Sequence, residues 1–306
     1  SPSMAHTPPA RLRPRILKAL APILALLSLA ACSPQQMVMR SVADELASQG
    51  QSAENDLELA REASAFYLKF SESVLRPQPG HTGLAAAVAG GFTQYAYAFV
   101  AFEADRIEAT DAKAAQRLRE RAARLYRRGR DHALTALELT RPGFRQALAD
   151  PAAQPALRTE QLALAYWGAA AWGGMISLSK DDPDTVADLP LAIQLARLAW
   201  HLDPGFGDGN LASLMGSFET ARPGGTRASA EAYFDEALRL GQGRSAGAFV
   251  AKAEGIAQPA GDKAAFLDLL NQAVAVTDAP GSPLALSNEV MRRRARWLIE
   301  SADDLF

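Results

Sequence analysis

A single cysteine, Cys32, carries the most definite chemistry in this chain of 306 residues. It ends the run Leu29-Ala30-Ala31-Cys32, which closes a short apolar stretch over residues 19–31. Four basic side chains precede that stretch, at Arg11, Arg13, Arg15 and Lys18. A basic region, a brief apolar region and small residues before a cut site are typical of a secretory signal peptide. The residues before Cys32 therefore predict cleavage at the cysteine and acylation of its thiol.

The predicted leader is too short to span a bilayer, which takes about 20 apolar residues, and Pro22 interrupts it. The alternatives are an ordinary signal peptide with a chance cysteine, or a buried N-terminal helix. Bacterial lipoproteins carry two or three acyl chains, enough for stable anchoring. Ser33 stands where an aspartate would signal inner-membrane retention. We therefore predict a signal peptide over residues 1–31 and a lipid-anchored tether over 32–53, on the periplasmic face of the outer membrane.

Side chains suited to acid–base or nucleophilic catalysis are few and scattered. The histidines of the predicted mature chain, His81, His132 and His201, show no metal-ligand spacing. With Cys32 acylated, no thiol remains for a disulfide, a cysteine-based zinc site or a nucleophile. Glu300-Ser301 is similar to the Glu-Ser of lytic transglycosylases, but only five residues follow it, where a catalytic lobe would be needed. We predict that the protein is not an enzyme and binds neither a metal nor a cofactor.

The acidic run Asp181-Asp182-Pro183-Asp184 is the remaining candidate for cation binding. Calcium loops place oxygen ligands at defined alternate positions and close with a glutamate, and no such pattern follows here. Aspartate before a helix accepts hydrogen bonds from the free N–H groups of its first turn. The run therefore predicts a turn and a helix cap.

Net charge excludes another class of partner. The whole chain stands at −2, and the leader carries four positive charges and no negative ones, so the mature protein lies near −6. Nucleic-acid-binding domains instead show a basic patch or stripe, so we predict no nucleic-acid partner. Outside the leader we find no apolar run long enough to cross a membrane.

The elements that position these residues have helical periodicity, without strand-like alternation. One apolar stripe starts at Leu57 and includes Tyr67 and Phe70, and a second runs from Leu84 to Phe102. Further helices are predicted at about 112–139, 157–179, 186–202, 208–220, 227–240, 262–276 and 283–302. We predict an all-α fold, with residues 54–306 forming one domain.

A repeat in the second half indicates stacked helical hairpins. Residues 190–203 and 228–241 align with an offset of 38, pairing Ala192 with Ala230 and Ala199 with Ala237. Small residues at these positions, with Pro204 after the first copy, resemble the tetratricopeptide pattern. Stacked pairs of this kind leave a concave surface for a ligand or partner. The predicted architecture is a tetratricopeptide-like helical-hairpin solenoid.

Aromatic and glycine residues cluster on two of the predicted helices. Glycine inside a helix costs about 1 kcal/mol relative to alanine, so its use implies a close helix approach or room for a ligand. One interpretation is that the aromatic rings fill the core while the glycines let helices approach. The other is that some of the rings line an apolar cleft, the usual form of a small-molecule site. The candidate ligand-binding residues are Tyr95, Phe99, Tyr166, Trp167 and Trp172.

These residues belong to motifs that resemble the TatT family, the T components of tripartite ATP-independent periplasmic (TRAP) transporters. The motifs include Gly90-Gly91-Phe92, Tyr95-Ala96-Tyr97-Ala98-Phe99-Val100, Tyr166-Trp167-Gly168, Trp172-Gly173-Gly174, Leu202-Asp203-Pro204 and Asp304-Leu305-Phe306. The resemblance covers the chain from about residue 54, whereas His81-Thr82-Gly83 departs from the family pattern. It implies a lipid-anchored, non-enzymatic homotrimer of tetratricopeptide-like hairpins. The implied partners are a periplasmic solute-binding (P) component and an apolar small molecule held in a cleft.

A different role remains open on the same features. A lipoprotein scaffold in cell-envelope assembly would share the helical hairpins and the anchor but would need no ligand cleft. Neighbouring genes for a solute-binding protein and a multi-spanning permease would favour the transporter role.

Overall fold

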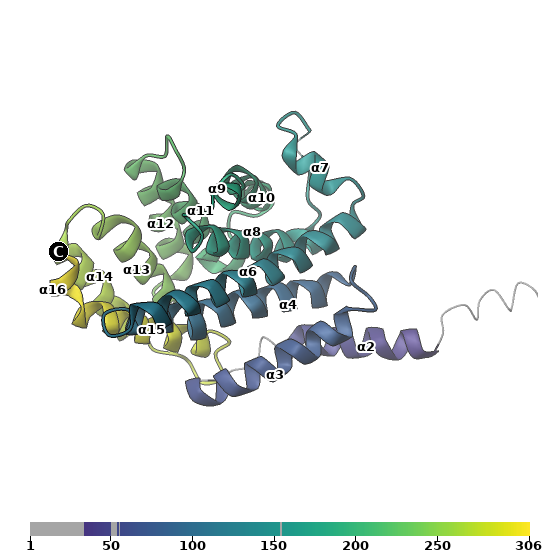
Figure 1. Ribbon diagram of the computed structural model, residues 1–306, viewed down its shortest axis with the longest axis horizontal. Helices are drawn as coiled ribbons and strands as arrows, with labels where there is room; N and C mark the ends of the chain where they lie inside the picture. Colours follow the sequence, from purple (N-terminus) through teal and green to yellow (C-terminus); the bar gives the residue numbers. More distant parts are fainter. Residues whose placement is uncertain (1–33, 50–53, 55, 154) are drawn as a thin grey trace, which may run out of the picture. The chain divides into compact units, whose positions relative to one another are not determined.

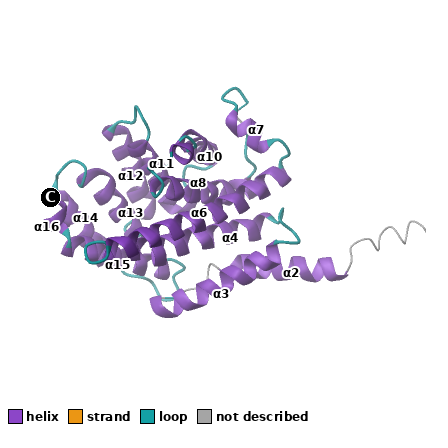
Figure 2. Ribbon diagram, in the orientation of Figure 1, coloured by secondary structure: helices purple, strands orange, loops and turns teal. Residues whose placement is uncertain are grey.

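The computed structural model describes residues 34–306 apart from 50–53, 55 and 154. Every regular element in that part of the chain is helical, and none of it forms a strand (Figure 2). Successive helices pack against one another in pairs, in a tetratricopeptide-like arrangement. The predicted all-α hairpin fold is confirmed. Cys32 and the predicted signal peptide lie outside the described residues.

The helices follow one another with short connections. Those of the first half are α2 (Pro34–Gln49), α3 (Leu57–Leu75), α4 (Thr82–Tyr95), α5 (Phe102–Ile107), α6 (Ala112–Thr140), α7 (Phe144–Ala149) and α8 (Leu162–Ser177). Those of the second half are α9 (Pro183–Val186), α10 (Leu189–Leu202), α11 (Asn210–Ala221), α12 (Arg227–Gly241), α13 (Ala246–Lys252), α14 (Lys263–Ala275), α15 (Ala285–Glu300) and α16 (Ala302–Leu305). Residues 43–306 form one compact unit, and residues 1–42 are assigned to another.

Side-chain caps fix where several helices begin. The carboxylates of Asp56, Asp111 and Asp262 each accept a hydrogen bond from the backbone N–H three residues later, at the starts of α3, α6 and α14. Such caps satisfy donors that have no partner inside the helix. Asp182 caps α9 in the predicted manner. His81 caps α4 through its ring nitrogen, 2.9 Å from the Leu84 amide, so the segment that departs from the family pattern is a helix start.

The core of the first half lies where α4, α6 and α8 pack side by side (Figure 1). Their facing positions hold small and apolar residues that are fully buried, including Leu84, Phe92, Leu137 and Leu164. The second half continues from α8 through α10 and α11 to α15, each helix packing on its neighbours. The two copies of the predicted repeat fall on α10 and α12, where Ala192, Ala199, Ala230 and Ala237 expose no surface.

Two π-helical segments interrupt the regular helices, η1 (Ala96–Ala101) and η4 (Ala253–Ala257). Helical periodicity did not predict them. The first joins α4 to α5, and the resulting stretch Thr82–Ile107 is long and apolar enough to cross a membrane. That finding contradicts our expectation of no such run. Slightly more than half of its most apolar window, 56%, is buried inside the protein, and a core helix would meet the same criterion.

The apolar stripe predicted on α3 is only partly buried. Ala60 and Val74 are covered, but Tyr67 and Phe70 are 48% and 44% exposed. Phe66, beside them, is 67% exposed and stacks on Phe70 with a centroid distance of 6.0 Å. Helical periodicity marks an apolar face but does not say whether another element covers it.

Candidate functional site

Aromatic rings of neighbouring helices rest on the glycines of α4 and α8. A Cβ atom at Gly90 would lie 2.8 Å from the Trp167 ring, and one at Gly174 would lie 2.7 Å from the Tyr126 ring. The Phe218 ring would be 2.9 Å from a Cβ at Gly173. These distances are below normal van der Waals contact, so each ring occupies the space that a side chain would fill. The glycine clusters therefore allow close packing, as one of our two interpretations proposed.

The structure brings the five candidate ligand-binding residues together only in pairs. Tyr95 and Phe99 lie side by side, with ring centroids 5.4 Å apart, and Tyr166 and Trp167 form a second pair at 4.8 Å. Burial raises the pKa of the Tyr166 phenol above its ordinary value. Trp172 is paired with neither, and Arg130 lies over its ring, 5.3 Å from the centroid.

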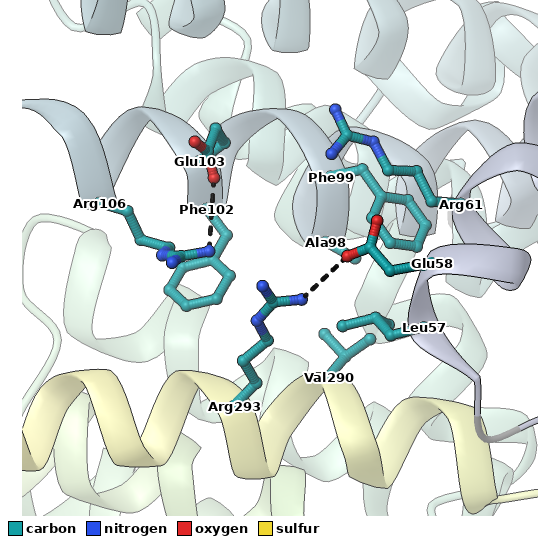
Figure 3. A pocket seen from close by; sticks show the side chains of 10 residues that line it. All are labelled: Leu57, Glu58, Arg61, Ala98, Phe99, Phe102, Glu103, Arg106, Val290 and Arg293. Carbon is teal, nitrogen blue, oxygen red and sulfur yellow. Dashed lines mark ion pairs between the residues drawn. The ribbon is translucent and has the colours of Figure 1, made fainter.

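One surface hollow, which we call the Arg293 cavity, lies between α3, the η1–α5 segment and α15 (Figure 3). It is small, about 40 Å³. Its lining residues are Leu57, Glu58, Arg61, Ala98, Phe99, Phe102, Glu103, Arg106, Val290 and Arg293.

Two ion pairs lie among the residues that line the Arg293 cavity, and one of them joins α15 to α3. Arg293 lies 3.8 Å from Glu58 of α3, and Arg106 lies 3.6 Å from Glu103 (Figure 3). Phe99 is the only one of the five candidate ligand-binding residues in its lining. A volume near that of one or two water molecules leaves no room for an organic ligand.

A second hollow, which we call the Trp172 cavity, lies between α6, α7, α8 and the start of α10. Its volume is about 280 Å³, just below the usual range for small-molecule sites. The lining residues are Arg130, Asp131, Leu134, Arg145, Leu148, Trp172, Asp188 and Leu191. Trp172 is the only one of the five candidate residues in this lining.

Trp172 has an unusual hydrogen-bonding state. Its side chain is 5% exposed, and its indole N–H is buried with no acceptor. Among the described residues it is the only buried side-chain nitrogen or oxygen in that state. Buried polar groups are nearly always paired, so this donor needs an explanation.

A largely buried arginine lies beside the Arg293 cavity, and no sequence pattern had indicated it. The Arg294 guanidinium donates two hydrogen bonds to Glu254 of η4, at 2.7 and 3.0 Å, and one to Asp105 of α5 at 3.3 Å. The Tyr97 ring of η1 lies 5.7 Å from it, and burial raises the pKa of the Tyr97 phenol to about 12. Both π-helical segments therefore contact one cation, and π-bulges often mark sites under functional constraint.

A buried carboxylate holds α3 against α6. Glu72 accepts hydrogen bonds from Lys69 at 2.7 Å and Arg128 at 2.5 Å, and its other oxygen lies 2.8 Å from His132 Nε2. Burial alone would raise the pKa of Glu72, but these three partners outweigh it and lower the pKa to about 2. The arrangement pins one helix to another and leaves no free acid or base.

The histidines show no shared site. His81 caps α4 and bonds Asp44 at 2.7 Å, His132 bonds Glu72, and His201 is exposed near the end of α10. No cluster of three or more potential metal ligands occurs in the part of the chain that the structure describes. Nothing in these residues forms a nucleophile with its base.

Comparison with known proteins agrees with the motif analysis. The family of TRAP transporter T-components matches residues 53–306, most of the chain. An uncharacterized protein of Treponema pallidum (strain Nichols) is 27% identical over 265 residues, which cover 83% of this chain and 81% of that protein. The resemblance that we drew from the aromatic and glycine motifs is thereby confirmed, and this chain belongs to the TRAP transporter T-component family.

Proposed function

We propose that this protein is a lipid-anchored, non-enzymatic accessory component of a TRAP transporter, facing the periplasm from the outer membrane. The observation that carries the proposal is the family match over residues 53–306. The residues around the two cavities support a binding role, because most of their charged groups form ion pairs and none forms an acid–base dyad or metal cluster among the described residues.

In this role the protein, as a homotrimer, docks the periplasmic solute-binding component and holds a small ligand with an apolar part. Stacked helical pairs offer extended surfaces for such partners. Of the five aromatic candidates, we expect Trp172 to contact the ligand, because it lines the larger of the two cavities and the smaller one has no room for an organic molecule.

A pull-down tests the docking. The full chain carrying Cys32→Ser is immobilised and exposed to the solute-binding protein encoded beside it, up to high micromolar concentration. We expect a saturable complex, with an unrelated periplasmic solute-binding protein as the control. If neither protein is retained at that concentration, the docking proposal is wrong.

The anchor is tested separately by cell fractionation. Cys32→Ser removes the thiol that carries the acyl chains, so we expect the variant in the soluble fraction and the wild type in the outer-membrane fraction. Retention of the variant in the membrane would place the anchor elsewhere. Gel filtration with light scattering of the released variant measures the trimer.

A further inference from the structure

The Trp172 cavity combines an apolar floor with charged groups at its rim. Leu134 of α6, Leu148 of α7 and Trp172 of α8 are each 5% exposed, and Leu191 of α10 is partly covered. A pocket with mostly apolar walls and a few polar groups is the common form of a small-ligand site. The polar groups of this lining are therefore expected to determine which ligand the site selects.

The charges in this lining are unequally paired. Arg130 lies 2.9 Å from Asp131 and 4.0 Å from Asp188, and its side chain is 16% exposed. Arg145 of α7 is exposed, and its guanidinium donates a long hydrogen bond of 3.5 Å to the Thr135 hydroxyl. No carboxylate in the described part of the chain lies within ion-pair distance of Arg145. One cation at the cavity thus lacks a counter-charge, although the lining as a whole is neutral.

The indole N–H of Trp172, a residue of the same lining, is a buried donor without a partner. Leaving a buried donor without a partner costs about 1–3 kcal/mol, and an acceptor supplied by a ligand would remove that cost. The nitrogen exposes almost no surface, so an acceptor reaches it only when a neighbouring side chain moves. Arg130, which lies over the indole ring, is a long side chain able to make that movement.

We propose that the Trp172 cavity binds a small amphiphilic monocarboxylate. Its carboxylate accepts hydrogen bonds from Arg145 and the Trp172 indole, and its apolar part lies against Leu134, Leu148 and Leu191. The inference deepens the proposed function, because it names the class of ligand that the T component holds.

The lining also indicates what the site rejects. Asp131 and Asp188 lie in the same wall, so a second carboxylate on the ligand would meet like charge. A neutral alcohol of the same length would leave Arg145 without a counter-charge. A single negative charge on an apolar chain satisfies both donors, so charge number and tail length are both part of the proposed selectivity.

Isothermal titration calorimetry with octanoate tests the proposal, using the full chain with Cys32→Ser so that no acyl chain of its own competes. Suberate, the eight-carbon dicarboxylate, and 1-octanol are the comparison ligands. We expect saturable binding of octanoate and binding at least tenfold weaker for each comparison ligand. Equal binding of 1-octanol would show that the charge is not recognised. The absence of a heat of binding with octanoate at millimolar concentration would overturn the proposed site.

Two variants locate the binding. Trp172→Phe keeps an aromatic ring and removes the N–H, and Arg145→Gln removes the charge. Each should lower the affinity for octanoate by about tenfold, as expected for the loss of a hydrogen bond to a charged group. The matched controls are Trp200→Phe and Arg117→Gln, which change the same residue types outside the cavity and should leave the dissociation constant unchanged. If all four variants bind octanoate like the parent, the ligand lies elsewhere and the inference is wrong.

The same variants separate this inference from the docking role. Trp172→Phe should still retain the solute-binding component in the pull-down, because the cavity variant changes no surface proposed for docking. Loss of octanoate binding with docking intact supports the proposed site in the Trp172 cavity. Docking by the parent together with no octanoate binding overturns the cavity and leaves the transporter role standing.

Discussion

The Arg293 cavity and the Trp172 cavity are built from the same kinds of side chain and differ in what those side chains contact. Each has arginines, acidic residues and an aromatic wall, and each is closed on one side by a separate helix, α3 in the first and α7 in the second. In the first, the Arg293–Glu58 pair joins α15 to α3 and the Arg106–Glu103 pair lies within α5, beside a hollow of about 40 Å³. In the second, Arg145 has no carboxylate partner among the described residues and the Trp172 N–H has no acceptor, beside about 280 Å³ of space.

The comparison shows that residue composition does not identify a binding site. Surface arginine and glutamate pairs contribute little to stability and little to recognition. A buried donor that the protein itself leaves unpaired, such as the Trp172 N–H, is informative, because folding normally eliminates such groups. The variants below change one cavity at a time and measure whether the two respond differently.

The largest effect is expected from Trp172→Ala. Truncation of a buried tryptophan removes apolar contacts and leaves a void, at a cost of about 3–5 kcal/mol in unfolding free energy. Phe99→Ala, in the wall of the Arg293 cavity, removes a half-buried ring and should cost about 1–2 kcal/mol, in proportion to the smaller buried area. Urea denaturation of both variants measures the difference. Equal costs would mean that the two aromatic walls are packed alike.

Arg294→Gln should come next, because it breaks the buried contacts behind the Arg293 cavity. Its side chain is 12% exposed, and its loss removes both hydrogen bonds to Glu254 and the one to Asp105. Removing one partner of a buried ion pair costs about 3–5 kcal/mol, and the partial exposure of Glu254 reduces this to roughly 2–4 kcal/mol. Octanoate binding at the Trp172 cavity should persist in the folded variant. Loss of that binding would show that the two regions are coupled.

Much of this architecture could be predicted from the sequence, because helical periodicity, caps and the repeat of α10 and α12 are local signals. The start of α8 lies at 162 and not at 157, because a short 3₁₀ turn, Thr159–Gln161, precedes the helix. The predicted helices did not include α7, and the 280 Å³ cavity depends on this short helix. Sequence patterns also gave no sign of Arg294, whose partner Asp105 lies 189 residues away along the chain.

The candidate site was predicted less well than the fold. The aromatic pattern selected Trp172, but it also selected Tyr95, Tyr166 and Trp167, which line neither cavity. The sequence pattern did not indicate Arg145, because only the three-dimensional structure shows that no carboxylate of the described residues lies near it. That five-residue set remains a prediction until ligand binding is measured.

Lowering the pH should weaken the attachment of α3, which supplies one wall of the Arg293 cavity. The pKa of Glu72 is about 2 in the folded protein, against an ordinary value of 4.5. A lowered folded-state pKa stabilises the protein above pH 4.5, and this stabilisation is lost as the pH falls toward 2. The loss should be about 2–3 kcal/mol between pH 5 and pH 2.

Glu72→Gln tests the origin of that loss. The variant should be less stable at pH 7 and should show a shallower fall in unfolding free energy from pH 5 to pH 2. Glu62→Gln, an exposed acid on the same helix, is the control and should keep the wild-type slope. A wild-type slope in Glu72→Gln would assign the acid sensitivity to other carboxylates. Octanoate binding at pH 7 should be unchanged, because Glu72 does not line the Trp172 cavity.

The smallest effect is expected from Arg293→Gln, one residue before the buried Arg294. Arg293 and Glu58 are 40% and 76% exposed and lie 3.8 Å apart, so water screens their attraction and the loss should be below about 0.5 kcal/mol. The substitutions of Arg293 and Arg294 would then differ several-fold in the unfolding free energy that they remove, because one side chain faces solvent and the other faces Glu254. Arg293→Gln should also leave octanoate binding unchanged, since its cavity has no room for the ligand. A measurable loss of octanoate affinity in this variant would place the recognising charge on α15 and reverse the assignment of the two cavities.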